Sequence, residues 1–254
     1  MRYIKITIAA VLWLGLAVLG PASAASRTFE TALETKAGPL ELHIVQHASF
    51  VLRWNDRVIY VDPVGGAEAY AGLPAPDIVL LTHPHPDHLD PETLTGLDTG
   101  RAVFVMPSSV AERLDSRLGR EQIVLGNGEA SDRLGNGLRA VPMYNLPASP
   151  QAYHPKGWGN GYVLTLADRQ IYISGDTEGT PEMRSLTDID LAFVCMNLPY
   201  TMDTAQAADA VQDFAPGIVY PYHYRGQDVA DFQQRLQARD SDIQIRLRDW
   251  YSGA

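Results

Sequence analysis

The fold is decided by a short histidine-rich stretch, Thr82-His83-Pro84-His85-Pro86-Asp87-His88. Its histidines follow directly after an apolar run (78–82), which predicts a buried strand. His83 and His85 are two residues apart, so in an extended segment both side chains project the same way and can reach one ion. Asp87 and His88 point elsewhere and can serve a second ion. The alternative is a histidine-rich surface loop without metal, but the interleaved prolines stiffen the segment and lower the entropy lost on chelation, which favours a metal site.

Composition limits what kind of protein can carry this motif. The chain has 254 residues, of which 46% are hydrophobic and 20% charged, so a disordered or fibrous chain is excluded. Its net charge is −10, and the lack of a basic excess excludes a nucleic-acid partner. There are seven histidines but a single cysteine, Cys195. A transition-metal site must therefore be built from histidine and carboxylate.

The N-terminus has the pattern of a secretory signal peptide. Arg2 and Lys5 precede an apolar run (6–19), and Ala22-Ser23-Ala24 supplies small residues for cleavage. A retained membrane anchor is the alternative, but the run is short for a span of about 20 residues. We therefore expect residues 1–24 to be removed and the mature chain, 25–254, to be periplasmic or secreted, with a charge of −12 and no stable membrane span.

The mature chain has many short strands and few helices, with no linker between two halves. Its class is α/β (α+β), and we predict one domain of two mixed β-sheets packed together and flanked by helices. A short helix begins after Asp90, and longer ones cover 108–118, 204–214 and 229–238. Asp203 and Gln206 form a capping-box pattern. The expected strands are 28–35, 40–45, 50–54, 58–61, 78–82, 103–106, 123–125, 138–143, 162–166, 171–174, 191–195, 218–220 and 243–247.

The whole mature chain resembles the metallo-β-lactamase-fold hydrolases, whose hallmark is this H-x-H-x-D-H motif after a buried strand. It is most similar to the branch with the ascorbate-phosphate lactonase-like and N-acyl-phosphatidylethanolamine phospholipase D-like proteins. The supporting segments are Gln46-His47-Ala48-Ser49, Ile59-Tyr60-Val61-Asp62-Pro63, Ser174-Gly175-Asp176-Thr177, Asn197-Leu198-Pro199-Tyr200 and Pro221-Tyr222-His223-Tyr224. The resemblance implies an αββα sandwich.

The resemblance also implies a set of metal ligands. His83 and His85 would bind metal one, and Asp176 would bridge both ions; metal two would be bound by Asp87, His88 and His223. Asp176 follows a predicted strand, and Gly175 lets the backbone turn sharply there. The alternatives are a turn or capping role for Asp176 and simple packing for His223.

The third histidine of metal one is less directly indicated. Many relatives place it after a Val-Pro-x-Tyr strand end, where this chain has Asn145. The next histidine, His154, lies in a long segment (144–161) rich in proline, glycine and aromatic residues, which is typical of a functional loop. We assign the role to His154; otherwise Asn145 contributes.

Several further residues are expected around the ions. His47 is expected in the second shell or facing the substrate. Asp62 can orient a ligand histidine, with a turn-forming Asp-Pro as the alternative. Asn197 and Tyr200 are expected near the pocket, where packing is an equally good interpretation for the aromatic residue. Cys195 lies mid-strand and is not expected to be a ligand.

The predicted function is an exported metal-dependent hydrolase. Two divalent ions, zinc foremost with manganese or iron also compatible, would supply hydroxide to attack an ester, lactone or phosphodiester of a small-molecule or lipid-derived substrate. Asp87 and Asp176 are the catalytic candidates, with Asp87 able to pass a proton. One alternative is a non-catalytic metal-binding module on the same fold. Another is an oxygen- or NO-reducing diiron protein, which the lack of a glutamate in the motif and of a flavin domain disfavours.

Overall fold

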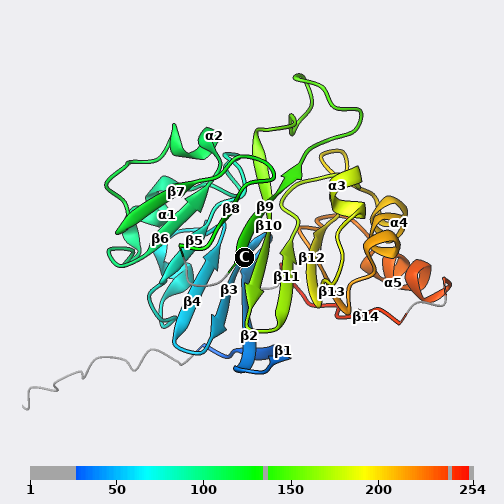
Figure 1. The fold of residues 1–254 in the computed structure, drawn as a ribbon, viewed down its shortest axis with the longest axis horizontal. Helices are drawn as coiled ribbons and strands as arrows, with labels where there is room; N and C mark the ends of the chain where they lie inside the picture. The colour runs from blue at the N-terminus through cyan, green and yellow to red at the C-terminus, as the bar shows by residue number, and fades with distance from the viewer. Residues whose placement is uncertain (1–26, 134–136, 240–241, 252–254) are drawn as a thin grey trace, which may run out of the picture.

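Two β-sheets packed face to face form the centre of the molecule, and helices cover their outer faces (Figure 1). The computed structural model describes residues 27–133, 137–239 and 242–251. Each sheet has seven strands and mixes parallel with antiparallel pairs. The predicted αββα sandwich is therefore confirmed. The predicted signal peptide, residues 1–24, lies outside the described residues.

Each sheet is built from one half of the chain. Sheet one contains, in spatial order, β1 (Glu30–Thr35), β2 (Gly38–Gln46), β3 (Ser49–Trp54), β4 (Arg57–Val61), β5 (Ile78–Leu80), β6 (Val103–Met106) and β7 (Glu121–Val124). Sheet two contains β8 (Ala130–Ser131), β9 (Leu138–Met143), β10 (Gly159–Leu166), β11 (Arg169–Ile173), β12 (Leu191–Cys195), β13 (Ile218–Tyr222) and β14 (Gln244–Ile245).

The two sheets share one pattern of strand pairing. In each, the first three neighbouring pairs are antiparallel and the last three are parallel. The sequence shows only a weakly repeated order of strands and helices, without a recognisable repeat. Because side chains can change while backbone pairing is kept, the similarity of the halves is visible in the topology and not in the residues.

The helices form the two outer layers. On sheet one lie η1 (Ala67–Tyr70), α1 (Pro91–Gly96) and α2 (Ser108–Ala111), which contribute Tyr70, Leu94 and Val110 to a buried cluster with that sheet. On sheet two lie α3 (Pro181–Arg184), α4 (Thr204–Phe214) and α5 (Val229–Gln237). The predicted caps are confirmed at Asp90 for α1 and in the capping box of Asp203 and Gln206 for α4.

The main hydrophobic core lies between the sheets. Phe50 of β3 stacks on Phe193 of β12 with ring centroids 4.4 Å apart, and Trp250 packs edge-on against both rings. All three side chains are buried. Replacing such an aromatic residue by alanine typically costs 3–5 kcal/mol, on the order of a third of a domain's stability. This core therefore fixes how the two sheets face each other, and with it the site at their edge.

Some elements differ from the sequence prediction. The helix expected over 108–118 is wrong beyond Ala111, because the Asp115 carboxylate accepts a hydrogen bond from the Arg117 backbone N–H and so competes with helical pairing. Gly119 then has a φ of +74°, which a helix does not allow. The short elements η1, β8 and α3 are not in the prediction. Among the described residues, no helix combines the length and apolar character that a membrane span requires.

Candidate metal centre

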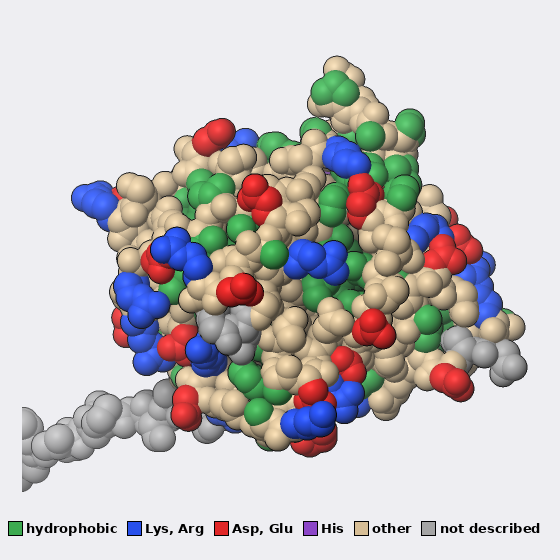
Figure 2. Space-filling model, viewed as in Figure 1, with side chains coloured by type: hydrophobic (Ala, Val, Ile, Leu, Met, Phe, Trp, Pro, Cys, Tyr) green, Lys and Arg blue, Asp and Glu red, His purple; other side chains and the backbone are tan. Residues whose placement is uncertain are grey.

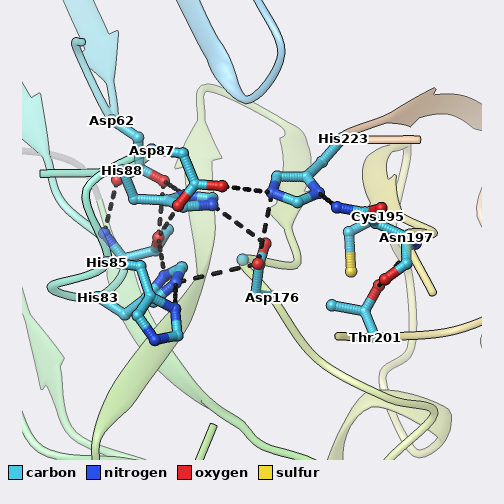
Figure 3. Close-up of polar contacts among 12 residues, drawn as sticks. Asp62, His83, His85, Asp87, His88, Asp176, Cys195, Asn197, Thr201 and His223 are labelled. Carbon is cyan, nitrogen blue, oxygen red and sulfur yellow. Dashed lines mark hydrogen bonds and ion pairs between the residues drawn. The ribbon is translucent and has the colours of Figure 1, made fainter. Parts of the chain in front are cut away.

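The predicted site residues gather where parallel strands of both sheets end. Asp62 follows β4, His83 follows β5, Asp176 follows β11 and His223 follows β13. Because carboxyl ends of parallel strands meet at one edge, ligands commonly bind there. Figure 3 shows these side chains converging from the two sheets, with Asp176 in the middle. The two halves of the chain thus each supply part of one centre.

The backbone turns sharply where these side chains leave the strands. His47, Asp62 and His223 all have left-handed φ values, of 50°, 41° and 48°. This conformation costs on the order of 1–2 kcal/mol for a residue with a Cβ and is usually kept only where the structure needs it. Gly175, before Asp176, has a φ of 60°, which confirms the predicted turn. A Cβ there would lie 2.6 Å from Sδ of Met143, so a larger residue would have to displace that side chain and also adopt the left-handed conformation.

Three histidine nitrogens form the first group of donors. His85 Nδ1 lies 3.0 Å from His83 Nε2 and 3.2 Å from His154 Nε2. Ligands bound tetrahedrally at 2.0–2.1 Å from one ion stand about 3.3–3.4 Å apart, so the observed spacing suits a single ion. His154 therefore lies where the sequence prediction places the third histidine of metal one.

Asn145 fixes the loop that carries His154. Its Oδ1 accepts the His154 backbone N–H at 2.8 Å, and its own N–H donates to the His154 carbonyl at 3.0 Å. Its Nδ2 also donates to the carbonyl of Tyr200 at 2.8 Å. Both ends of the side-chain amide are hydrogen-bonded to the backbone. Asn145 therefore positions His154 and is not one of the metal-facing donor residues.

Asp176 lies between this group and a second one. Its Oδ1 is 3.3 Å from His88 Nε2, and its Oδ2 is 3.4 Å from His223 Nε2. The same Oδ2 lies 3.5 Å from His154 Nε2 and 3.9 Å from His83 Nε2. One buried carboxylate thus faces donors of both groups, which is the arrangement of a bridging ligand.

Asp87 completes the second group at the edge of the cavity. Its Oδ2 is 3.5 Å from His223 Nε2 and 3.2 Å from His47 Nε2. Its side chain is 48% exposed, whereas that of Asp176 is 4% exposed. Asp87 is therefore the more accessible of the two carboxylates.

His47 directly contacts two of the predicted metal ligands, Asp87 and His223. Its ring is 3.9 Å from that of His223, and its carbonyl accepts the His223 backbone N–H. Its Nδ1 lies 2.9 Å from the hydroxyl of Tyr251. Both ring nitrogens are therefore engaged, and His47 holds Asp87 in place. The sequence prediction did not include Tyr251, because nothing local marks a residue 204 positions away as its partner.

A second layer orients the histidines. Asp62 is fully buried; its carboxylate accepts His88 Nδ1–H at 2.7 Å and the backbone N–H of Thr82 at 2.7 Å. An imidazole that donates from Nδ1 keeps Nε2 free as a ligand, so Asp62 sets the tautomer that a metal needs. On the opposite side, the Asn197 amide lies 3.3 Å from His223 Nδ1.

Two histidines of the first donor group and both carboxylates have the protonation state that suits metal binding. Burial holds the pKa of His83 well below its usual range and lowers that of His154 to about 4, so both rings are neutral. Burial raises the pKa of the Asp176 carboxyl, but nearby His223 and His88 outweigh it and keep this pKa well below normal. The same balance holds for Asp87: burial raises its pKa, but His223 and His47 beside it lower the pKa by more. Burial lowers the pKa of His88, but Asp176 and Asp62 outweigh it and raise this pKa well above normal, so His88 carries a proton that a bound cation would displace.

Orphaned polar atoms show that the donor set fits metal ions. His88 Nε2, His223 Nε2 and Asp176 Oδ1 are buried and have no hydrogen-bond partner among the described residues. Buried polar atoms are nearly always paired, and all three point into the centre. Cys195 is excluded as a ligand because its thiol is buried against the Thr177 backbone. Nitrogen and oxygen donors remain, a set that suits zinc, manganese or iron.

Known proteins share both the fold and this region of the chain. A family model described as the beta-lactamase superfamily domain matches residues 41–223. The chain is 31% identical over 206 residues to the UPF0173 metal-dependent hydrolase of Pyrobaculum calidifontis, covering 76% of this chain and 89% of that protein. A candidate metal-dependent hydrolase from Parabacteroides distasonis has a crystal structure with a TM-score of 0.78 and 36% identity, covering 87% of this chain and 98% of that one.

A more distant structure shares the fold alone. Igni18, a metallo hydrolase from Ignicoccus hospitalis, has a TM-score of 0.70 at 23% identity and covers 84% of this chain and 96% of its own. Fold and donor groups together define an enzyme of the metallo-β-lactamase fold. Within that class, the chain belongs to the UPF0173 family of metal-dependent hydrolases.

Proposed function

We propose that this protein is an exported hydrolase that binds two divalent ions at one centre and cleaves an ester, lactone or phosphodiester. One observation carries the proposal: the buried carboxylate of Asp176 faces two separate groups of donors at 3.3–3.9 Å. A site for one ion needs no such shared ligand. Two ions a few ångströms apart do, because a bridging carboxylate offsets their mutual repulsion.

The donors divide into two ligand sets. We assign His83, His85 and His154 to the first and Asp87, His88 and His223 to the second, with Asp176 shared. The close donor groups in the structure are His83, His85 and His154; His47, Asp87 and His223; and His83, His88 and Asp176. Asp62 and Asn197 orient histidines of the second set, while Asn145 places His154. Zinc is the first candidate for both positions, with manganese and iron also compatible with histidine and carboxylate ligands.

Two ions held by these residues would supply a hydroxide nucleophile near neutral pH and would stabilise negative charge that develops on the substrate. The chain contributes what the ions cannot. Asp176 holds the two halves of the centre together from a buried position. Asp87, exposed to the cavity and fixed by His47 and His223, can accept a proton from the reacting group and pass it on.

The cavity in front of the centre is sized for a small molecule. Its volume is about 560 Å³, within the roughly 300–1,000 Å³ typical of ligand sites. His85, Asp87, Asp176 and His223 lie in its wall, so a molecule in the cavity reaches both donor groups.

Metal removal and restoration test the proposal. Purified protein should contain about two divalent ions per chain; chelation should abolish hydrolysis in a screen of lactones, esters and phosphodiesters, and adding zinc or manganese should restore it. Hydrolysis that survives complete metal removal contradicts the proposal. Two bound ions without turnover of any substrate class would support the non-catalytic metal-binding module instead.

Export is a separate part of the proposal. It rests on the basic start, the apolar run and the small residues before position 25. The mass of the protein recovered from its native host should correspond to a chain that begins at Ala25. A protein that retains residues 1–24 in the cytoplasmic fraction contradicts export but leaves the hydrolase proposal intact.

A further inference from the structure

The metal-facing donor residues form the floor of the cavity, and exposed hydrophobic residues lie around its rim. Five large hydrophobic residues among those described are exposed by more than 40%, namely Val124, Leu146, Tyr153, Leu198 and Tyr200. Three of them, Tyr153, Leu198 and Tyr200, line the cavity of the metal centre. Exposed apolar groups that gather at one opening usually mark a place where a ligand binds.

Two segments from different parts of the chain build this apolar rim. Tyr153 lies between β9 and β10, and its ring meets that of Tyr200, after β12, edge to face at 5.0 Å. The segments are also joined by the hydrogen bond from Asn145 to the Tyr200 carbonyl. Figure 2 shows further hydrophobic side chains on the segment between β9 and β10, which projects at the top of the view. Contacts between the two segments therefore hold the exposed apolar side chains of the rim in place.

One cation belongs to the same cavity. Arg225 is the single lysine or arginine in its lining, and its side chain is exposed. Within residues 27–133, 137–239 and 242–251 no carboxylate pairs with it; its recorded contact is with the ring of Tyr251, 5.7 Å from Cζ. Most of the other arginines that the structure describes form ion pairs, as Arg184 does with Asp209 and Asp213.

Charge in the loaded cavity favours an anion. Two bound dications carry more positive charge than the carboxylates of Asp62, Asp87 and Asp176 offset, and Arg225 adds to the excess. The chain as a whole carries −10, so an anionic molecule needs such a local attraction to approach. A guanidinium with free donors binds carboxylate or phosphate oxygens in a directed, often bidentate way.

We propose that the substrate is an amphiphilic anion, whose apolar chain or ring packs on Tyr153, Leu198 and Tyr200 while its carboxylate or phosphate pairs with Arg225. This inference rests on the proposed hydrolase function, since it names the class of molecule that the same cavity takes. The scissile bond would lie between the two anchored parts, over the metal centre.

Binding to the metal-loaded protein tests this without requiring turnover. The ligands form a matched series: hexanoate and hexyl phosphate are amphiphilic anions, hexanamide lacks the charge, and acetate lacks the chain. Calorimetry should show at least one of the two amphiphilic anions binding about tenfold more tightly than hexanamide and than acetate. The anion that loses more affinity in Arg225→Gln identifies the group recognised.

Variants separate the two anchors. Arg225→Gln should remove about tenfold of the preference for an anion and leave hexanamide unchanged. Leu198→Ala should weaken hexanoate and hexyl phosphate severalfold and leave acetate unchanged. Arg120→Gln, an equal charge change on the surface with its side chain outside this cavity, is the matched control. It should change nothing.

Three outcomes overturn the inference: Arg225→Gln behaves like Arg120→Gln, hexanamide binds as tightly as the anions, or the protein sediments with phosphatidylglycerol vesicles and Leu198→Ala abolishes this, which would make the rim a membrane contact. Failure of the hydrolase proposal looks different. In that case Arg225-dependent binding persists although no ester, lactone or phosphodiester is cleaved.

Discussion

The floor and the rim of the cavity follow opposite rules. At the floor, Asp62, His88 and Asp176 are buried, and each contacts several charged or polar partners. At the rim, Leu198 and Arg225 are exposed. Arg225 forms no ion pair with another described residue and contacts the ring of Tyr251. The difference teaches that chemistry and selectivity are carried by separate parts of the molecule, one fixed by the packed sheets and one free to vary.

The physical reason lies in the cost of change. Removing one partner from a buried charged network leaves another charge without compensation, which costs several kcal/mol. Changing an exposed side chain usually alters stability by less than about 0.5 kcal/mol. Floor residues are therefore constrained by folding and by metal binding together, whereas rim residues are constrained only by the ligand that they bind.

The largest effect is expected at Asp176. Asp176→Asn keeps the shape but removes the charge shared by both donor groups, so metal content and hydrolysis should fall together, the rate by at least about 100-fold. Mass spectrometry of bound metal and steady-state kinetics check this. The account fails here if the variant keeps two ions per chain and wild-type turnover.

A smaller loss is expected one layer further out. Asp62→Asn should weaken metal affinity by roughly 10- to 100-fold, because His88 loses the acceptor that keeps its Nε2 available. Metal titration against a competing chelator measures the change. Asp56→Asn, an exposed aspartate in the turn before β4, is the control and should have wild-type affinity. Equal affinities in the two variants would show that Asp62 does not orient His88.

A modest effect is expected where the chain end meets the floor. Tyr251→Phe removes the hydroxyl beside His47 Nδ1 and so loosens the ring that holds Asp87. One such hydrogen bond contributes about 1 kcal/mol, so kcat/KM should fall about fivefold with metal content unchanged. Tyr60→Phe is the control, because it removes a comparable bond, to the Pro74 carbonyl, in the outer cluster of sheet one. If both variants lose activity equally, the effect is on stability and not on His47.

The smallest effect is expected at the rim. Leu198→Ala should change the free energy of unfolding by less than about 0.5 kcal/mol, because the side chain is 47% exposed. Urea denaturation of metal-free protein measures this. A loss above about 1 kcal/mol would show that the rim supports the fold, and the contrast between rim and floor would then break down.

Local spacing explains what could be predicted from the sequence. His83, His85, Asp87 and His88 occupy one short segment, so their grouping follows from the motif and the strand before it. Asp176 is marked by the strand and glycine that precede it. The central strands could be predicted for a similar reason, since short continuous apolar runs mark strands that are buried on both faces.

Long-range contacts explain what could not be predicted. The contact between His47 and Tyr251 joins β2 to the end of the chain, and Arg225 enters the cavity only because β13 ends beside the centre. Neither residue carries a local pattern. The helix after Ser108 fails for a different reason: its apolar spacing is correct, with Val110 and Leu114 buried, but the Asp115 side chain diverts the backbone.

The central claim is that one carboxylate joins two ions. A crystal structure of the metal-loaded protein, with anomalous scattering recorded at the metal edge, tests it most directly. The account predicts two peaks about 3.5–4 Å apart, with an oxygen of Asp176 facing each, and His154 at the peak shared by His83 and His85. A single peak, or two peaks of which only one contacts Asp176, would contradict it.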